Sequence, residues 1–273
     1  MSKIFEYIGL FSLVCFSYII TEKTSTVAKS MDEIMINIKN NYTKYEEKPI
    51  DALINNKDII IGNCGKYVDI DKSYLEMKKK GIYDDKLYQY KYVYPNTRLN
   101  NNYNKYIVSG SKNKNYIYIF IYINESNKYL LNNYSFTNYN FIVNSNFYFN
   151  NYSLINKLIK NNNSILIEET DFKDFKKISN HYKKYYNSTI YCYNKKNNDS
   201  FLELCSSNES GTIKNIDIYR NNYLYHLKVN LKKGNFYNFS LNKELINSIK
   251  LIDTYLNQRE IYKSNIDSNL KEC

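Results

Sequence analysis

The sequence has no tryptophan, two prolines, seven glycines and two histidines among its 273 residues. Neither of the glycine-rich phosphate-binding patterns, G-x-G-x-x-G or G-x-x-x-x-G-K, is present. The histidines and cysteines show no C-x-x-C or H-x-x-x-H spacing, which argues against a set of metal ligands. We therefore expect no metal site and no cofactor.

Arginine is also scarce, with only three residues among the 38 basic ones. Because bidentate phosphate recognition relies on arginine, the net charge of +11 does not by itself indicate a nucleic-acid partner. Basic and acidic residues are interspersed, and no RNA-binding signature appears. We expect the partner to be another protein rather than a nucleic acid.

Asparagine, lysine, tyrosine and isoleucine are abundant, and there are 32 tyrosines. All four are residues with A- and T-rich codons. In this respect the whole chain resembles secreted proteins of AT-rich apicomplexan parasites of the malaria type. The resemblance is one of composition and implies secretion rather than a particular fold.

The N-terminus has the pattern of a secretory leader. Lys3 precedes an almost wholly apolar run at residues 8–20, which is the length of a signal-peptide core and short for a membrane span. We expect residues 1–21 to be a signal peptide, with an uncleaved anchor, a buried helix or an organellar targeting leader as alternatives. After cleavage no stable membrane span would remain. The expected location is the secretory pathway: outside the cell, on the parasite surface, or in the lumen of a secretory organelle or vacuole.

Abundant N-x-S/T sequons, such as the one at Asn41, make the chain a candidate glycoprotein.

Several segments have helical patterns. Ser30 and Glu33 form a capping box that predicts a helix over residues 31–45. A second helix is expected from about residue 171, and a third over residues 245–256, where apolar residues recur at helical spacing. Residues 116–123 alternate aromatic and isoleucine side chains, which predicts a central strand covered on both faces.

The C-terminal half contains short apolar runs separated by polar turn residues. This spacing is typical of hairpins, so we expect an α+β fold with an antiparallel β-rich meander or sandwich-like sheet and flanking N- and C-terminal helices. A single domain over residues 25–273 is expected, with a subdivision near residue 150 as the alternative. The runs interpreted as strands are residues 189–193, 200–205, 213–219, 223–229 and 236–239.

Lysines cluster at two places. Residues 78–80 are lysines that precede Gly81, a pattern that suits the end of a helix better than a binding patch. The helix expected from residue 171 carries Lys173, Lys176, Lys177 and Lys183 on its polar face.

Removal of the leader would remove Cys15 and leave four cysteines. An even number in a secreted chain predicts disulfides. Cys192 and Cys205 flank the turn at Asn198 and would face each other across a hairpin, so we expect them to pair. Cys64 would then pair with Cys273, unless Cys273 forms an intermolecular disulfide with another protein.

Cys64 lies in the motif GNCG, where a strand ends, and is the one candidate nucleophile. A catalytic cysteine needs a base that lowers its pKa. His181 lies on a lysine-rich helix and His226 on the polar face of an expected strand, and neither has an orienting carboxylate. We therefore expect no enzyme, with a cysteine-dependent hydrolase that uses Cys64 and either histidine as the alternative.

The sequence thus predicts a secreted or surface-associated parasite protein without catalytic activity. It would act as a disulfide-stabilised structural or protein-binding module. Tyrosine-rich β surfaces suit such a role because tyrosine combines a large contact area with a polar tip.

Overall fold

A computed structural model describes residues 2–270 and divides the chain into two compact units. Unit 1 comprises Met1–Lys48 and Gly65–Val93, and unit 2 comprises Pro49–Cys64 and Tyr94–Cys273. Unit 1 is therefore built from two segments of chain, and residues 49–64 of unit 2 lie between them in sequence. The single domain expected over residues 25–273 stays a prediction.

Unit 1 begins with the long helix α1 (Ser2–Met31), followed by α2 (Glu33–Asn41) and a 3-10 turn, η1 (Tyr42–Tyr45). The capping box expected at Ser30 does not form. Asp32 caps α2 instead, because its side chain accepts a hydrogen bond from the amide of Ile34 at 3.0 Å. The helix predicted over residues 31–45 therefore starts two residues late and ends as a 3-10 turn.

The rest of unit 1 is a hairpin and a helix. Strands β3 (Gly65–Val68) and β4 (Tyr90–Val93) pair antiparallel, and α3 (Ile70–Lys80) and η2 (Asp85–Leu87) lie between them in sequence. Gly81 follows α3 in the left-handed conformation, at φ 70°, after three lysines in the last turn. The structural interpretation of this lysine cluster is confirmed.

Helix α1 carries many apolar side chains without packing partners. Phe11, Leu13 and Phe16 are each about 70% exposed. Within the part of the chain that the structure describes, no helix combines the length and apolarity needed to cross a membrane.

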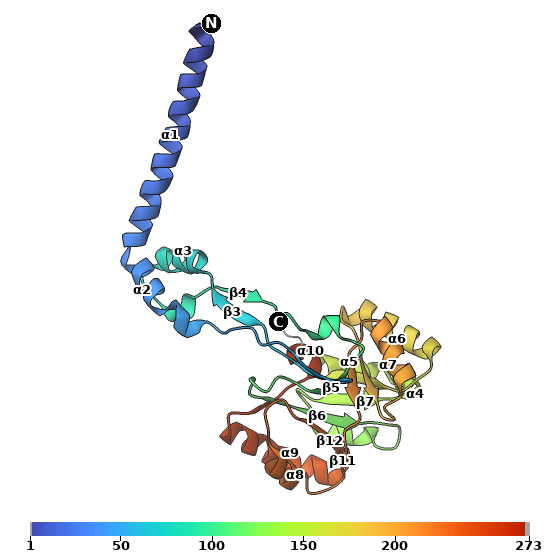
Figure 1. The fold of residues 1–273 in the computed structure, drawn as a ribbon. Helices are drawn as coiled ribbons and strands as arrows, with labels where there is room; N and C mark the ends of the chain where they lie inside the picture. The colour runs from blue at the N-terminus through green and yellow to red at the C-terminus, as the bar shows by residue number, and fades with distance from the viewer. Residues whose placement is uncertain (1, 271–273) are drawn as a thin grey trace. The chain divides into compact units, whose positions relative to one another are not determined.

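Unit 2 is organised around one large sheet (Figure 1). The strand order is β1-β2-β5-β10-β9-β8-β7-β6-β12-β11, and β13 pairs with β6 beside this path. Every pairing is parallel except that of β1 with β2. The strands are β1 (Leu53–Asn55), β2 (Asp58–Ile60), β5 (Tyr106–Ser109), β6 (Tyr116–Tyr122), β7 (Asn140–Val143), β8 (Ser164–Glu168), β9 (Tyr191–Asn194), β10 (Thr212–Lys214), β11 (Ile218–Tyr219), β12 (Phe236–Ser240) and β13 (Tyr262–Lys263).

Helices connect the parallel strands. The chain passes from β7 through α4 and α5 to β8, through α6 to β9 and through α7 to β10, which is a run of βαβ units. The helices of unit 2 are α4 (Ser145–Asn150), α5 (Tyr152–Lys160), α6 (Phe172–Tyr186), α7 (Asp199–Ser207), α8 (Tyr223–Asn230), α9 (Lys243–Gln258) and α10 (Ile266–Asn269), with 3-10 turns η3 (Leu99–Asn101) and η4 (Lys128–Asn133).

The sheet curls back on itself. Strands β5 and β12 are far apart in the strand order, yet the amide of Gly110, directly after β5, donates to the carbonyl of Gly234 before β12 at 2.9 Å. The hydroxyl of Ser109 reaches the same carbonyl at 3.0 Å. The sheet therefore has a concave inner face and an outer face.

Each face has its own core. Helices α4–α9 pack on the outer face, against side chains such as Ile119 and Phe141, and the inner face gathers Tyr118, Phe120 and their neighbours. Strand β6 contributes to both cores, so the prediction of a central strand covered on both faces is confirmed.

The antiparallel β-rich fold predicted from the sequence is wrong, because two of its expected strands are helices. Residues 200–205 lie in α7: Asn198 does not turn a hairpin but caps the helix, accepting from the amide of Ser200 at 3.0 Å. Residues 223–229 lie in α8, where the buried Tyr223 and Leu227 are four residues apart. Short apolar runs fit the periodicity of a strand as well as that of a helix, and these two segments form helices.

Candidate functional site

Parallel strands bring their carboxyl ends to one edge of the sheet, where ligands bind in sheets of this kind. In unit 2 this edge carries Tyr122 at the end of β6, Glu168 at the end of β8 and Lys195 directly after β9. The hydroxyl of Tyr122 donates to Glu168 Oε2 at 2.7 Å, and Lys195 Nζ lies 3.2 Å from Glu168 Oε1. We call these three side chains the Tyr–Glu–Lys group.

Within the Tyr–Glu–Lys group, the carboxylate of Glu168 is bound by both of the other side chains. The side chain of Glu168 is only 14% exposed, and a carboxylate this buried needs a partner. Lys195 supplies the opposite charge and also lies over the ring of Tyr122, 5.5 Å from its centroid. Burial raises the pKa of Tyr122 well above its usual value, and the neighbouring Glu168 raises it further. Tyr122 therefore stays a neutral hydrogen-bond donor at physiological pH.

A second buried polar group adjoins the first, since Tyr193 on β9 is the register neighbour of Glu168. The hydroxyl of Tyr193 donates to Asn215 Oδ1 at 3.0 Å and accepts from Asn238 Nδ2 at 3.2 Å. Burial raises the pKa of Tyr193 as well. The buried Oδ1 of Asn238 has no hydrogen-bond partner within the described residues. This end of the inner face is thus occupied by side chains that bind one another and leave one acceptor open.

Metal-binding side chains do not gather at this edge. Within residues 2–270 no group of three or more histidine, cysteine or acidic side chains is placed to hold a metal ion. Glu169, next to Glu168 in sequence, accepts instead from the amide of Lys196 at 3.2 Å. The expected absence of a metal and a cofactor stays a prediction.

The GNCG motif follows β2 and is held by backbone pairing. Ile50 and Asn63 exchange two backbone hydrogen bonds of 2.8 Å, so a Cβ at Gly62 would lie 2.1 Å from the carbonyl oxygen of Ile50. Glycine is needed at residue 62 because of this close approach. Cys64 is disulfide-bonded, so its sulfur is not a thiolate nucleophile. Cys273, its expected partner, lies outside the described residues.

Cys192 and Cys205 form a disulfide, with their Cα atoms 6.5 Å apart. The pairing is the expected one, but the hairpin from which it was inferred does not exist. Cys192 lies on β9 and Cys205 on α7, so the bond joins a helix to the outer face of the sheet.

Both candidate histidines contact tyrosines. On α6, His181 Nδ1 lies 2.9 Å from the hydroxyl of Tyr148, and its ring lies between those of Tyr152 and Tyr185, with centroids 4.6 and 4.4 Å away. Burial lowers the pKa of His181, and the charge of Lys184 lowers it further.

His226 lies on helix α8 rather than on the expected strand, and its ring packs 4.4 Å from that of Tyr219. Among the described residues no carboxylate contacts either ring, so the hydrolase alternative has no oriented base in this part of the chain.

A pocket of about 310 Å³ opens at the opposite, amino edge of the sheet. Three tyrosine rings and several neutral hydrogen-bonding side chains surround it, with one carboxylate. Its lining includes Tyr94, Tyr103, Tyr191, Asn100, Asn187 and Glu209. This composition suits a neutral polar ligand better than a reaction that needs paired charges.

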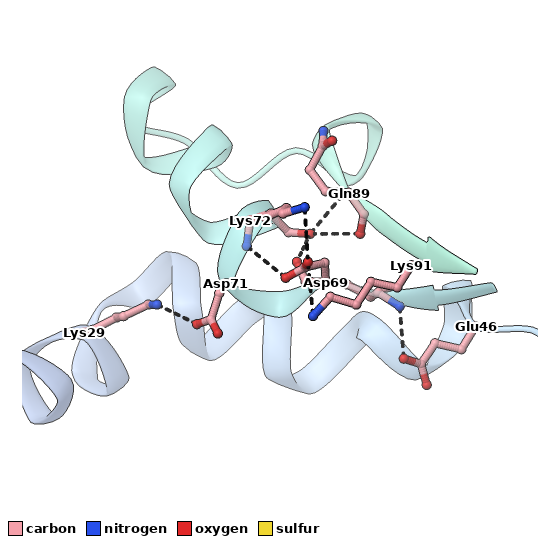
Figure 2. A network of polar contacts seen from close by, with 9 residues as sticks. Lys29, Glu46, Asp69, Asp71, Lys72, Gln89 and Lys91 are labelled. Atoms are coloured by element: carbon pink, nitrogen blue, oxygen red, sulfur yellow. Dashed lines mark hydrogen bonds and ion pairs between the residues drawn. The ribbon is translucent and has the colours of Figure 1, made fainter. Parts of the chain in front are cut away.

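Unit 1 has a polar network of its own, centred on Asp69 (Figure 2). The side chain of Asp69 is 5% exposed, accepts from the amide of Lys72 at 3.2 Å and lies 3.2 Å from Lys91 Nζ. Burial opposes ionisation of Asp69, but these contacts outweigh it and lower its pKa. The hydroxyl of Ser73 accepts from the amide of Gln89 at 2.9 Å. The network joins the start of α3 to the hairpin, and its role is structural.

Comparison with known proteins identifies the fold. Family models and curated proteins give no match. Solved structures of a CE4 family pseudoenzyme do match, and they contradict an antiparallel sheet. One similar structure is wild-type BA3943, a CE4 family pseudoenzyme from Bacillus anthracis, with a TM-score of 0.66 at 18% identity, over 89% of this chain and 96% of that chain. A BA3943 mutant with restored enzymatic activity has a TM-score of 0.64 at 17% identity, over 88% and 99%.

These matches show that the chain has a CE4-type fold. Sequence reasoning missed the Tyr–Glu–Lys group because it depends on parallel strands. The one available signal was Glu168 at the end of a strongly apolar strand, but its partners are 46 and 27 residues away in sequence.

Proposed function

We propose that the protein is a secreted, non-catalytic binding protein built on a CE4-type fold. The observation that carries this proposal is the Tyr–Glu–Lys group. It occupies the edge where sheets of this kind carry their chemistry, and its carboxylate is already bound by a lysine and a tyrosine. A general base would need a free carboxylate within reach of a substrate proton. The likeness to a CE4 family pseudoenzyme is consistent with this reading.

A hydrolysis assay tests the absence of catalysis. The full chain, with added Zn²⁺ or Mn²⁺, should hydrolyse 4-nitrophenyl acetate no faster than a metal-matched blank. The matched control is Glu168→Gln, which removes the charge and keeps the shape. Turnover by the wild type that disappears in E168Q would identify Glu168 as a base and contradict the proposal.

Secretion is the second part of the proposal. The exposed apolar side chains of α1 suit a leader that engages other machinery better than a helix packed in a core. Intact mass of the protein secreted from a eukaryotic host, after deglycosylation, should lack about twenty N-terminal residues. A full-length intracellular product would support the organellar or anchor alternatives.

The binding partner is proposed to be another protein. The tyrosines of β6 are largely buried, so the expected tyrosine-rich β surface is not the one that meets solvent. Exposed tyrosines come from other segments of unit 2, namely Tyr94, Tyr129, Tyr152, Tyr185, Tyr225 and Tyr262. Exposed tyrosines are typical of contact surfaces because they offer a large area at low entropic cost.

A further inference from the structure

Positive charge is concentrated on two neighbouring helices of unit 2. Helices α5 and α6 carry seven lysines and one acidic residue, Asp174, which gives a net charge of +6. This is more than half of the +11 carried by the whole chain. The lysines are Lys157, Lys160, Lys173, Lys176, Lys177, Lys183 and Lys184, and we call them the lysine surface.

All seven residues of the lysine surface face solvent. Helix α6 buries Phe175, Ile178 and Tyr182 against the sheet, and all its lysines are exposed. From Lys173 to Lys184 the lysines of α6 extend roughly 16 Å at 1.5 Å per residue. Helix α5 lies beside the end of α6, because Tyr186 of α6 donates a hydrogen bond to Asn156 of α5.

The described residues give these lysines no close acidic partner. Elsewhere lysines pair with acids, as Lys78 does with Asp32 and Lys263 with Asp253. Among residues 2–270 none of the seven lysines forms an ion pair of 4 Å or less. Like charges three or four residues apart destabilise a helix. A bound polyanion would reduce this repulsion between the lysines.

The surface favours a partner recognised by charge alone. Both helices lack arginine, the side chain that grips phosphate with two hydrogen bonds. The two helices carry three exposed rings, those of Tyr152, Phe172 and Tyr185. Lys176 lies over Phe172 at 5.7 Å, Lys184 lies over Tyr185 at 5.3 Å, and Tyr152 packs on His181 with ring centroids 4.6 Å apart. Tyr185 also packs on His181. Each of the three rings is already in contact with another side chain, which makes it a poor platform for the base stacking that binds single-stranded nucleic acid.

We propose that the lysine surface binds a linear sulfated polysaccharide. Sulfate groups along such a chain present single negative charges at intervals that flexible ammonium groups can follow, and charge complementarity provides the affinity. This inference is independent of whether the Tyr–Glu–Lys group is catalytic.

Heparin is the probe, and binding to the full chain is measured by calorimetry at several NaCl concentrations. The test variant is K173Q/K176Q/K177Q/K184Q. The matched control is K232Q/K233Q/K243Q/K250Q, which removes four exposed lysines elsewhere in unit 2. We expect the test variant to bind at least tenfold more weakly and its salt dependence, the slope of log Kd against log[NaCl], to fall by about 3. The control should stay within about twofold of the wild type.

Two further measurements complete the test. Glutamine is a good helix former, so the test variant should be at least as thermally stable as the wild type. Heparin should raise the Tm of the wild type and of the control variant, but not that of the test variant. Chemically desulfated heparin should not bind. Equal weakening of both quadruple variants would show attraction to net charge and overturn the proposal. So would tighter binding of a DNA oligonucleotide of equal charge, which would point to nucleic acid.

Discussion

Different kinds of interaction stabilise unit 1 and unit 2 internally. Unit 2 buries apolar side chains on both faces of a curled sheet, with large residues such as Phe120 and Phe141 wholly inside. Unit 1 has a core of seven buried apolar residues among those described, and places the ionised Asp69 beside it. Small units bury too little surface to be stabilised by apolar contacts alone. We infer that unit 1 depends on polar contacts to a degree that unit 2 does not.

The largest expected effect comes from paired core deletions. Phe141→Ala should lower the free energy of unfolding of unit 2 by about 3–5 kcal/mol, and Met77→Ala should lower that of unit 1 by about 2–4 kcal/mol. Hydrogen exchange of the amides of α6 measures the loss of stability in unit 2, and exchange of the amides of α3 measures that in unit 1. If Phe141→Ala loosened α3 as much as α6, the units would be one cooperative system and the comparison would fail.

Removal of the Cys192–Cys205 disulfide should have the next largest effect. The bond closes a loop with a sequence separation of 13, so the double variant C192A/C205A should lose about 3 kcal/mol, all of it in unit 2. Denaturant titration with and without reductant measures this loss. Met77→Ala in the same background is the control, since its effect should add to that of the disulfide.

The stability of the two units should fall in different pH ranges as the solution is acidified. The pKa of His181 is lowered from its usual 6.5, so its neutral form stabilises unit 2 above pH 6.5, and this stabilisation is lost as pH falls through the folded pKa. The described neighbours of His181 are tyrosines and Lys184, and none of them is an acidic partner for a protonated ring. His181→Phe should flatten the pH dependence of unit 2 between pH 7 and pH 5, measured by urea midpoints. An unchanged slope in the variant would assign the dependence to another group.

The smallest expected effect concerns Asp69. Its pKa is lowered from 3.8, so its ionised form stabilises unit 1 above pH 3.8, and this contribution is lost as pH falls through the folded pKa. Asp69→Asn should make amides of α3 exchange faster at neutral pH, with a difference from the wild type that shrinks below pH 3.8. Asp71→Asn is the control, because Asp71 is exposed and should change little.

Sequence patterns predicted correctly those helices and strands in which a single periodicity runs through the whole segment. The alternation at residues 116–123 identified β6, and the apolar stripe of residues 245–256 identified α9, because in each case one period fits the whole segment. Residues 200–205 failed because Asn198 serves equally as a turn residue and as a helix cap. This ambiguity changed a βαβ unit into a hairpin, and together with the same error at residues 223–229 it led to an antiparallel sheet in place of a parallel one.

The candidate site was beyond local prediction for a related reason. Glu168 meets Tyr122 and Lys195 only when β6, β8 and β9 run in the same direction. The GNCG motif attracted attention because glycine and cysteine are rare in this chain, yet Gly62 is explained by a close backbone contact and Cys64 by a disulfide. Rarity in a biased composition is therefore a weak guide to chemistry.

The order of segments along the chain limits how the protein can be dissected. Residues 49–64 supply β1 and β2, which cover the free edge of β5 in the large sheet, although they precede the second half of unit 1. A fragment that starts at residue 94 would contain most of unit 2 but leave β5 with unpaired backbone groups. An exposed edge of this kind recruits other strands, so such a fragment should aggregate. Expression boundaries for unit 2 must therefore lie before residue 49, with residues 65–93 of unit 1 retained as an insertion.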